Sequence, residues 1–406
     1  MMNLEIATFL LSTEGRATLH ELTADPGDLT ESARLATVSR LRRRFSPEEA
    51  AGLLEVATAR VRAAQQNKFS RASEMFFTKT GLEQSSSEAI STYRAERYTQ
   101  NFPPGSRIAD LGCGIGGDSL GLAYYQKVTG VDLDSARLLF ARANAAAYGI
   151  SHNFDTLEAD ITDLDVASYD ALFFDPARRT AEGRRIFSVE DYAPPLSIIK
   201  KWLPLVPNIG VKIAPGVNYA ELSDYDCEVE IISENGDVKE AVLWFGRLRS
   251  EEAGKPVTRR ATLLPERHSL TAAHERPEIG LVEPQAYLYE PDGAVIRAGV
   301  VEELAASLNA SKLDENIAFL TSVEFVATPF ARAFRVIESM PFNLKKLSRR
   351  LNELKIGRVT VKKRGSPLDP QELERALKLK GSPANAAIVV LTHVLGVHYA
   401  IICEAC

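Results

Sequence analysis

Apolar residues in the first 70 positions recur at helical spacing, and polar residues mark where a helix begins. Ser46, Pro47 and Glu49 form a capping-box pattern, with a proline in the first turn. The apolar residues that follow lie at positions 50, 53, 54, 57 and 61, the spacing of one helix face. We therefore predict that residues 1–70 are helical, with one helix that begins after Ser46 and ends near Gln66.

Between residues 107 and 245 short apolar runs alternate with helical segments. A helical stretch predicted over 82–98 comes before them. The runs lie at 107–111, 127–132, 155–158, 171–174 and 209–213. Strands that alternate with helices predict a parallel sheet with right-handed crossovers. Two further β-rich runs, 228–232 and 240–245, flank Asn235-Gly236, a pair that favours a tight hairpin. The prediction is a parallel sheet that ends in an antiparallel hairpin.

The rest of the chain predicts a connector and a second, smaller unit. Residues 250–284 are rich in Arg, Glu, Pro and His without clear periodicity, and we expect one irregular hairpin there. Segments 286–290 and 294–297 flank a Pro-Asp-Gly turn, and 331–337 is a further α/β piece. Helices are expected at 344–354 and 369–378, a strand at 358–363, and a closing strand pair within 386–402 that breaks at Leu395-Gly396.

These patterns predict an α/β protein with four segments. They are an N-terminal helical region (1–70), a Rossmann-like domain (71–250), a connector with a hairpin (251–318) and a small α+β domain (319–406). With 45% hydrophobic and 25% charged residues, the composition is that of an ordinary globular protein and excludes wholesale disorder. Four cysteines cannot form the disulfide framework of a small secreted domain. The N-terminal residues lack the features of a signal peptide, so we expect a cytoplasmic protein without a membrane role.

The segment 110–117, DLGCGIGG, follows a predicted strand and opens a predicted helix. Glycines at such a loop permit positive φ and remove the Cβ atoms that would block a ligand. Gly112, Gly114 and Gly117 also satisfy the G-x-G-x-x-G pattern of dinucleotide sites. The loop alone therefore leaves S-adenosylmethionine and NAD open as cofactors.

Acidic residues near the strand ends and the predicted hairpin favour S-adenosylmethionine. Asp110 lies before the first glycine, where its carboxylate can orient the loop and accept from the amino-acid end of the ligand. Asp132 closes the next strand, in position to accept both ribose hydroxyls. Asp160, after the third strand, could accept from the adenine amine or be an ordinary loop residue. A doubly wound NAD domain normally continues with parallel strands, whereas this one is expected to end in a hairpin.

The segment 110–175 resembles the class I S-adenosylmethionine-dependent methyltransferases. The similar motifs are DLGCGIGGDS at 110–119, GVDLD at 130–134, the helix ending FARANAAAYGI at 140–150, and the strand that leads to Asp175-Pro176. In detail they resemble the RNA-cap trimethylguanosine synthase branch, in which a segment similar to 76–78 lies over the cofactor. The resemblance covers about 70–250. It implies cofactor contacts at Thr78, Asp110, Gly112, Cys113, Gly114, Gly116, Asp132, Leu133, Asp160 and Ile161.

The whole chain resembles a bacterial group of methyltransferases with a C-terminal THUMP-like domain. The shared marks are DPARR at 175–179, YLYEP at 287–291, RAG at 297–299 and KRG at 363–365. In amino-methyltransferases the first of these loops is commonly Asn/Asp-Pro-Pro-aromatic and holds the target amine, which implies that role for Asp175 and Pro176. Ala177 departs from the pattern, and the stacking aromatic residue is missing. Arg178 and Arg179, with Arg184 and Arg185 behind them, either hold an anionic group or form a solvated basic loop.

The charge of the chain is unevenly distributed. The total of 48 Lys and Arg against 54 Asp and Glu gives −6, yet residues 341–380 hold 12 basic and 4 acidic residues, or +8, which leaves −14 for the other 366. Lys362, Lys363 and Arg364 end a predicted strand there and could follow a phosphate backbone. THUMP-like domains are associated with RNA-modifying enzymes, which agrees with this. A solvated charged face is the alternative.

We predict a methyltransferase that uses S-adenosylmethionine to N-methylate a base of RNA. Two alternatives stay open: a methyltransferase for a small molecule or protein whose anionic group is held by Arg178 and Arg179, and a non-catalytic protein that binds the cofactor. Neither the histidines nor the C-x-x-C pair, Cys403 and Cys406, has the surroundings of a metal site, so no metal is expected.

Overall fold

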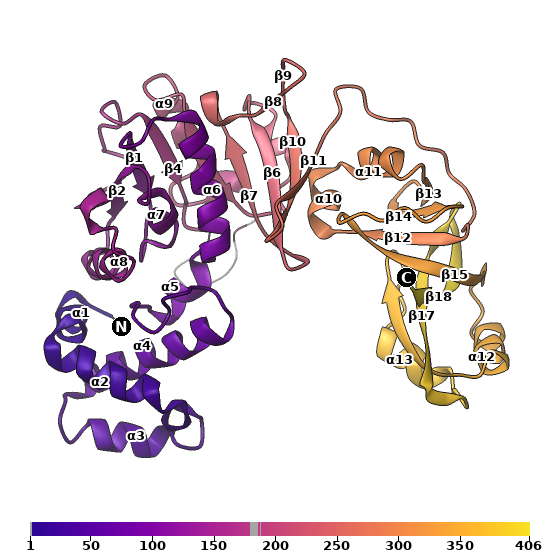
Figure 1. Ribbon diagram of the computed structural model, residues 1–406, viewed down its shortest axis with the longest axis horizontal. Coiled ribbons are helices and arrows are strands. Elements are labelled where there is room, and N and C mark those ends of the chain that lie inside the picture. Colours follow the sequence, from indigo (N-terminus) through magenta and orange to yellow (C-terminus); the bar gives the residue numbers. More distant parts are fainter. Residues whose placement is uncertain (1, 179–185, 187) are drawn as a thin grey trace. The chain divides into compact units, whose positions relative to one another are not determined.

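Two large sheets organise the chain (Figure 1), and they confirm the predicted α/β fold class. The computed structural model describes residues 2–178, 186 and 188–406. The chain folds into two compact units. Unit 1 comprises Met1–Glu228 and Glu240–Pro256, and unit 2 comprises Val229–Lys239 and Val257–Cys406. The N-terminal helical region and the five strands predicted to be parallel therefore belong to the same unit.

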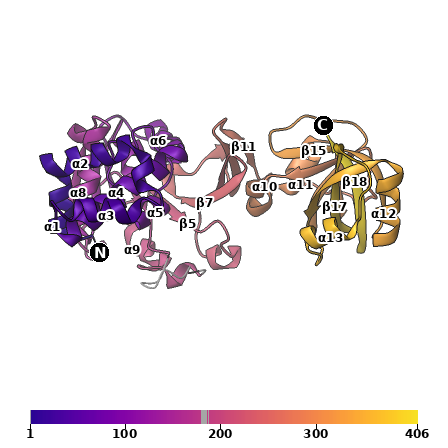
Figure 2. The same cartoon turned by 90° about the horizontal axis from the view of Figure 1, so that it is seen from below.

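Four helices begin the chain, as the sequence predicts. They are α1 (Leu4–Leu11), α2 (Thr13–Ala24), α3 (Arg34–Leu41) and α4 (Pro47–Gln65). The predicted capping box is confirmed, because the Ser46 hydroxyl accepts from the Glu49 N–H and the Glu49 carboxylate accepts from the Ser46 N–H. Gly52 of α4 lies against Ile6 of α1 so closely that a Cβ would be 2.7 Å from the Ile6 side chain. Figure 2 shows α1, α2 and α4 on the side of α8 (Ser135–Ala147), which α1 contacts.

The single helical stretch predicted over 82–98 is wrong. The structure has two helices there, α5 (Lys79–Gln84) and α6 (Glu88–Asn101), separated by three serines. The Ser87 hydroxyl accepts from the Ile90 N–H and so caps α6. Serine hydroxyls compete for backbone hydrogen bonds, which favours a helix start over a helix interior.

Five parallel strands form the centre of unit 1. They are β1 (Arg107–Leu111), β2 (Lys127–Asp132), β3 (Phe154–Glu158), β4 (Ala171–Phe174) and β5 (Ile209–Ile213), in the sheet order β5-β4-β1-β2-β3. All five predicted strands are confirmed, and β3 begins one residue earlier than expected. Every residue of β4 and β5 is buried. Neither strand therefore shows the alternation of a half-exposed strand, and Lys212 is the charged residue within β5.

The predicted hairpin is confirmed as β6 (Glu228–Glu234) and β7 (Asp237–Trp244). Asn235 and Gly236 both have positive φ, 54° and 82°, as a type I′ turn requires. Strand β7 pairs antiparallel with β5. The sheet continues beyond the hairpin, with β10 (Arg259–Leu264) parallel to β6 and β11 (His268–Thr271) antiparallel to β10. Together with the small pair β8 (Glu251–Glu252) and β9 (Lys255–Pro256), the stretch expected to hold one hairpin holds two.

The second sheet has seven strands in the order β13-β14-β12-β15-β18-β17-β16. Their bounds are β12 (Tyr287–Pro291), β13 (Ser311–Asp314), β14 (Ile317–Ser322), β15 (Ala331–Pro341), β16 (Ile356–Lys363), β17 (Ser382–Val394) and β18 (Val397–Ala405). The predicted closing pair is confirmed, with Leu395 and Gly396 at positive φ between β17 and β18. Segment 294–297 lies in α10 (Gly293–Ala298), which Asp292 caps; α11 (Val301–Ser307) follows.

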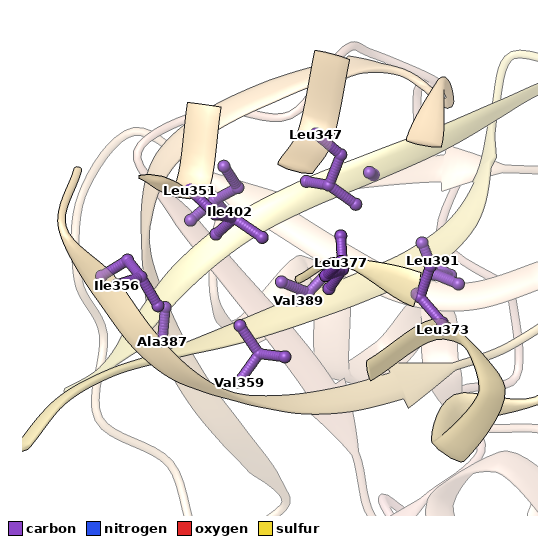
Figure 3. Packing of buried hydrophobic residues seen from close by; sticks show 11 residues of the cluster. Leu347, Leu351, Ile356, Val359, Leu373, Leu377, Ala387, Val389, Leu391 and Ile402 are labelled. Atoms are coloured by element: carbon purple, nitrogen blue, oxygen red, sulfur yellow. The ribbon is translucent and has the colours of Figure 1, made fainter. Parts of the chain in front are cut away.

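Two helices cover part of this sheet and close its larger core. Leu347 and Leu351 of α12 (Leu344–Glu353) and Leu373 of α13 (Pro370–Ala376) pack with buried residues of β16, β17 and β18 (Figure 3). Both helices lie near their predicted positions. Across residues 2–178 and 188–406, no helix is long and apolar enough to cross a membrane.

Candidate functional site

The glycine loop connects β1 to α7 (Gly117–Leu122) in unit 1. Gly112, Gly114 and Gly116 all have positive φ. A Cβ on Gly112 would lie 2.8 Å from the Asp175 carbonyl oxygen, whereas a Cβ on Gly114 would meet no atom within 4 Å. Gly112 therefore lets the loop approach the end of β4, and the backbone at Gly114 borders open space.

Asp132, at the end of β2, holds this loop in place. One carboxylate oxygen accepts from the Gly114 N–H at 2.9 Å, and the other accepts from the Asp134 N–H at 2.9 Å. Each oxygen keeps a second lone pair, which could accept a ligand hydroxyl. Leu133, the next residue, is 68% exposed.

Cys113 is buried in the loop and packs against β2. Its Sγ occupies the space that a side chain at Gly130 would need, because a Cβ there would lie 2.9 Å from the sulfur. Burial and the nearby Asp110 and Asp132 carboxylates raise the pKa of the Cys113 thiol well above its usual value. The thiol is therefore protonated at neutral pH and is poorly suited to act as a nucleophile.

Asp110 is fully buried on β1, directly before the loop. The Ser119 hydroxyl donates to its Oδ2, and among the described residues its Oδ1 has no hydrogen-bond partner. Burial and the neighbouring Asp118 carboxylate raise the pKa of Asp110 to about 8. An unpartnered buried carboxyl oxygen is costly.

Thr78 lies at the start of α5, close to the glycine loop. Its hydroxyl accepts from the Gly81 N–H at 2.8 Å, and a Cβ on Gly81 would lie 3.1 Å from the Ile115 side chain. Asn144 of α8 joins the two segments, because its amide hydrogen-bonds both the backbone of Phe76 and the Ile115 carbonyl. The segment 76–78 therefore lies beside the loop.

Asp160 is exposed after β3, and its carboxylate is engaged locally. One oxygen accepts from both the backbone N–H and the hydroxyl of Thr162, each at 2.8 Å. These hydrogen bonds lower the pKa of Asp160. Ile161 beside it is half-buried.

Asp175 and Pro176 follow β4. The Asp175 N–H donates to the Leu111 carbonyl, which fixes the backbone next to the glycine loop. Its carboxylate is 20% exposed, and Oδ2 lies 2.7 Å from the Lys212 Nζ. Pro176 is buried, and Arg178 is half-buried. Arg179, Arg184 and Arg185 lie outside the described residues.

A buried ion network behind Asp175 has no counterpart in the sequence predictions. Its other members are Lys212 of β5, Asp118 of α7, Arg94 of α6 and Glu240 of β7. Arg94 pairs with Asp118, lies 3.2 Å from Glu240, and stacks with its Cζ 4.6 Å from the Phe173 ring centroid. The sequence does contain a sign of this network, namely charged residues within strands expected to be buried, such as the lysine in IGVKI. A buried charge needs a partner.

The network contains more acidic than basic groups. With Asp110 it has four carboxyl groups against the two cations Arg94 and Lys212. Burial disfavours the charged form of Asp118, but Arg94 and Lys212 outweigh that cost and lower its pKa. Burial raises the pKa of Glu240, although the same two cations oppose the shift. The carboxyl ends of β1, β4 and β5 thus meet at a site with an excess of acidic groups.

In unit 2, Lys362, Lys363 and Arg364 do not form a single basic face. Lys362 lies 2.6 Å from the Glu290 carboxylate, and the Arg364 guanidinium stacks 5.5 Å from the Phe319 centroid. Successive side chains of a strand point to opposite faces, so Lys363 lies on the face opposite to Lys362. Lys363 donates to the Leu368 carbonyl.

Many other cations of the segment 341–380 remain exposed. Arg349 and Arg350 of α12 pair with Glu353, and Arg350 also pairs with Glu338. Besides Lys363, seven exposed cations of this segment have no ion pair with any described residue: Lys345, Lys346, Lys355, Arg358, Arg375, Lys378 and Lys380. These seven residues are called the basic set below.

Comparison with known proteins assigns the parts of the chain. Residues 108–179 match a family described as a methyltransferase domain, 331–405 match the THUMP domain-like family, and 3–63 match a domain of unknown function. Over 329 residues the chain is 33% identical to uncharacterised S-adenosylmethionine-dependent methyltransferases of two Mycobacterium tuberculosis strains, CDC 1551 / Oshkosh and ATCC 25618 / H37Rv. The alignment covers 78% of this chain and 85% of each relative.

A solved structure shares the overall fold. The crystal structure of a protein from Porphyromonas gingivalis W83, assigned as a methyltransferase, matches 97% of this chain and 99% of its own with a TM-score of 0.75 and 18% identity. The fold and site thus define a class I methyltransferase with a THUMP-like domain. The chain belongs to the S-adenosylmethionine-dependent methyltransferases, and S-adenosylmethionine is its cofactor.

Proposed function

We propose that this methyltransferase N-methylates a base of RNA. The observation that carries the proposal is the pairing, in one chain, of a methyltransferase domain with a THUMP domain-like segment at residues 331–405. That segment overlaps the basic set, which gives unit 2 exposed positive charge. Exposed lysines and arginines are the groups that bind phosphate backbones. The cytoplasmic location expected from the sequence belongs to the same proposal and is supported by four free cysteines.

We propose that the glycine loop and three acidic residues bind the cofactor. The unpartnered Asp110 Oδ1, the open space at Gly114 and the free lone pairs of Asp132 fit an adenosyl ligand that carries an ammonium group and two ribose hydroxyls. Thr78, Gly112, Cys113, Gly116, Leu133 and Ile161 complete the proposed set. Asp160 fits it less well, because its Oδ1 already accepts two hydrogen bonds from Thr162.

Asp175 and Pro176 are proposed to orient the acceptor amine. When bound, the cofactor supplies an electrophilic methyl group, and the acceptor lone pair takes it as the carbon–sulfur bond breaks and its electron pair stays on sulfur. Orientation and proximity can supply most of the rate acceleration of such a displacement. Arg178 and Arg179 are proposed to contact an acceptor phosphate.

The resemblance to the trimethylguanosine synthase branch bears on which base is methylated. The Asp-Pro sequence after β4 supports it, whereas Ala177 stands where the family pattern has a second proline. Tyr192 is a buried aromatic residue close to Asp175: burial, with smaller contributions from the Glu221 and Asp175 carboxylates, raises its pKa. We therefore propose N-methylation of a base without assigning the cap guanine as the acceptor.

The experiment that tests the function is methyl transfer from radiolabelled S-adenosylmethionine into the RNA, protein and metabolite fractions of cells that lack the gene. We expect label in RNA. Label only in protein or metabolites would contradict the RNA proposal, and no label despite tight cofactor binding would identify a non-catalytic binding protein.

The variant Asp175→Ala tests the proposed site within that experiment. We expect it to abolish transfer while cofactor affinity, measured by calorimetry, stays within about threefold, because the carboxylate is assigned to the acceptor. Asp163→Ala, at an exposed position after β3, is the matched control and should transfer at the wild-type rate. Loss of cofactor binding in Asp175→Ala would assign Asp175 to cofactor binding or structure instead.

A further inference from the structure

Lys212 lies in an unusual place for a lysine. It is the penultimate residue of β5, a strand whose five residues are all buried, and its side chain is only 3% exposed. Its ammonium lies 2.7 Å from Asp175 Oδ2, 3.7 Å from Asp118 Oδ2 and 3.5 Å from the Gln84 carbonyl oxygen. Burying an ammonium is costly unless such partners compensate.

The contacts of Lys212 are unequal. Asp118 already has Arg94 as an ion-pair partner, and Arg94 also pairs with Glu240. The shortest contact of Lys212 is with Asp175, and in the described part of the chain Lys212 is the ion-pair partner of Asp175. Because Asp175 is the member of the network with the greatest side-chain exposure, Lys212 links a buried charge network to the surface of the site.

We infer that Lys212 is a positioning residue for methyl transfer, which holds the Asp175 carboxylate in a fixed orientation toward the acceptor. The inference rests on the proposed function of Asp175. Lys212 engages Oδ2, while Oδ1 has no hydrogen-bond partner among the described residues and is left to accept from the substrate. An ion pair fixes the carboxylate more firmly than solvent does, and a fixed acceptor group supports an in-line displacement.

The charges around Asp175 explain why a cation is needed. The groups that face it electrostatically are Lys212 of β5, Arg94 of α6, Asp110 of β1, Asp118 of α7, Glu240 of β7, and Tyr192 from the segment after β4. Three of these are carboxyl groups. Among the described residues Lys212 is the cation that contacts Asp175 directly, whereas Arg94 contacts Asp118 and Glu240.

The same pairing favours an acceptor that is uncharged before transfer. A carboxylate held by an ammonium is a weak base, so it is poorly suited to deprotonate an alkylammonium group. The exocyclic amine of a nucleobase needs no such step: its lone pair forms the new carbon–nitrogen bond, the carbon–sulfur bond breaks with its electrons on sulfur, and the excess proton then passes from nitrogen to water. The inference thus specifies a weakly basic nitrogen as the methylated atom.

The test compares Lys212→Met and Lys212→Arg, with Lys201→Met as the matched control at an exposed position of the helix before β5. We expect Lys212→Met to slow transfer about tenfold or more, because the Asp175 carboxylate loses the contact that fixes its orientation. Lys212→Arg should restore most of the rate, and all variants should bind the cofactor within about threefold of wild type.

A measurement without an acceptor separates this inference from the proposed function. In protein labelled with ¹³C at aspartate carboxyl groups, with Asp175→Asn to assign the signal, the Asp175 carboxyl resonance should shift in Lys212→Met, which lacks the ion-pair partner, and stay in place in Lys201→Met. An unmoved resonance in Lys212→Met, or a rate that Lys212→Arg does not restore, would overturn the inference. If the label enters a fraction other than RNA, the RNA proposal fails, and the same variants are then tested with that fraction. Methylation of a protein lysine would contradict the inference that the methylated atom is a weakly basic nitrogen.

Discussion

Asp110 combines complete burial with an incomplete set of hydrogen bonds. Ser119 satisfies one carboxyl oxygen, and no described residue satisfies the other. Such a group costs stability in the protein alone unless a ligand or a water molecule supplies the missing hydrogen bond. The raised pKa of about 8 follows from the same burial, reinforced by Asp118.

Asp110 should make stability and cofactor binding depend on pH in opposite directions. An aspartate in the unfolded chain ionises near pH 4, while folded Asp110 has a pKa of about 8. Folding therefore takes up a proton between these values, and the free energy of unfolding contributed by Asp110 falls as pH rises through this window. Cofactor affinity should rise over pH 6.5–9, because the ionised carboxylate accepts from the ligand ammonium.

Thermal melting and calorimetry of wild type and Asp110→Asn over this pH range measure both effects. The asparagine variant cannot ionise, so its melting temperature should fall less than that of wild type from pH 6 to 8.5. Equal pH dependence in the two proteins would show that Asp110 is already ionised in the folded chain.

At the scale of elements, the apolar runs of the sequence predicted the strands well. They did not predict which distant residues come into contact. Strands β1, β2, β4 and β5 match their predicted bounds because each is a short segment with mostly buried apolar residues. The prediction missed the break between α5 and α6, because three consecutive serines are also compatible with the exposed face of one helix. In the structure Ser87 is the N-cap of α6. Lys212 was missed because its partner Asp175 lies 37 residues away, and no local pattern reports such a pair.

The alternation of side chains along β16 also corrects the predicted basic face. Lys362 is half-buried and paired with Glu290, whereas Lys363 is exposed on the opposite face. Lys362→Glu should therefore lower the free energy of unfolding by roughly 1–3 kcal/mol, since it places two carboxylates together. Lys363→Glu should change it by less than about 0.5 kcal/mol.

Urea denaturation of the two variants beside wild type gives this difference directly. The double variant Lys362→Glu/Glu290→Lys restores a pair of opposite charge and should recover part of the loss. If Lys362→Glu were as stable as wild type, the ion pair with Glu290 would carry no stabilisation, and Lys362 would be available to a substrate.

Over the whole molecule, the net charge of −6 combines an acidic remainder with a basic segment. The basic set lies in unit 2, and the buried cluster of acidic groups around Asp175 lies in unit 1. An acidic site suits a cofactor that carries positive charge, and exposed cations suit a polyanion. The two binding events should therefore respond differently to salt and to mutation.

This separation is tested with Lys345→Glu/Lys346→Glu, which reverses two exposed charges of α12 that have no ion pair among the described residues. RNA affinity in the wild type should fall steeply with salt concentration, because each phosphate contact releases counterions. In the variant the slope of log affinity against log salt should weaken by roughly 0.7–0.9 for each lost contact. Cofactor affinity should stay within about twofold of wild type, because Asp110, Gly114 and Asp132 are unchanged. Filter binding of total RNA and calorimetry with S-adenosylmethionine supply the two measurements. An unchanged salt slope would show that Lys345 and Lys346 of α12 do not contact RNA. A loss of both RNA affinity and cofactor affinity would show that the two binding events are not independent.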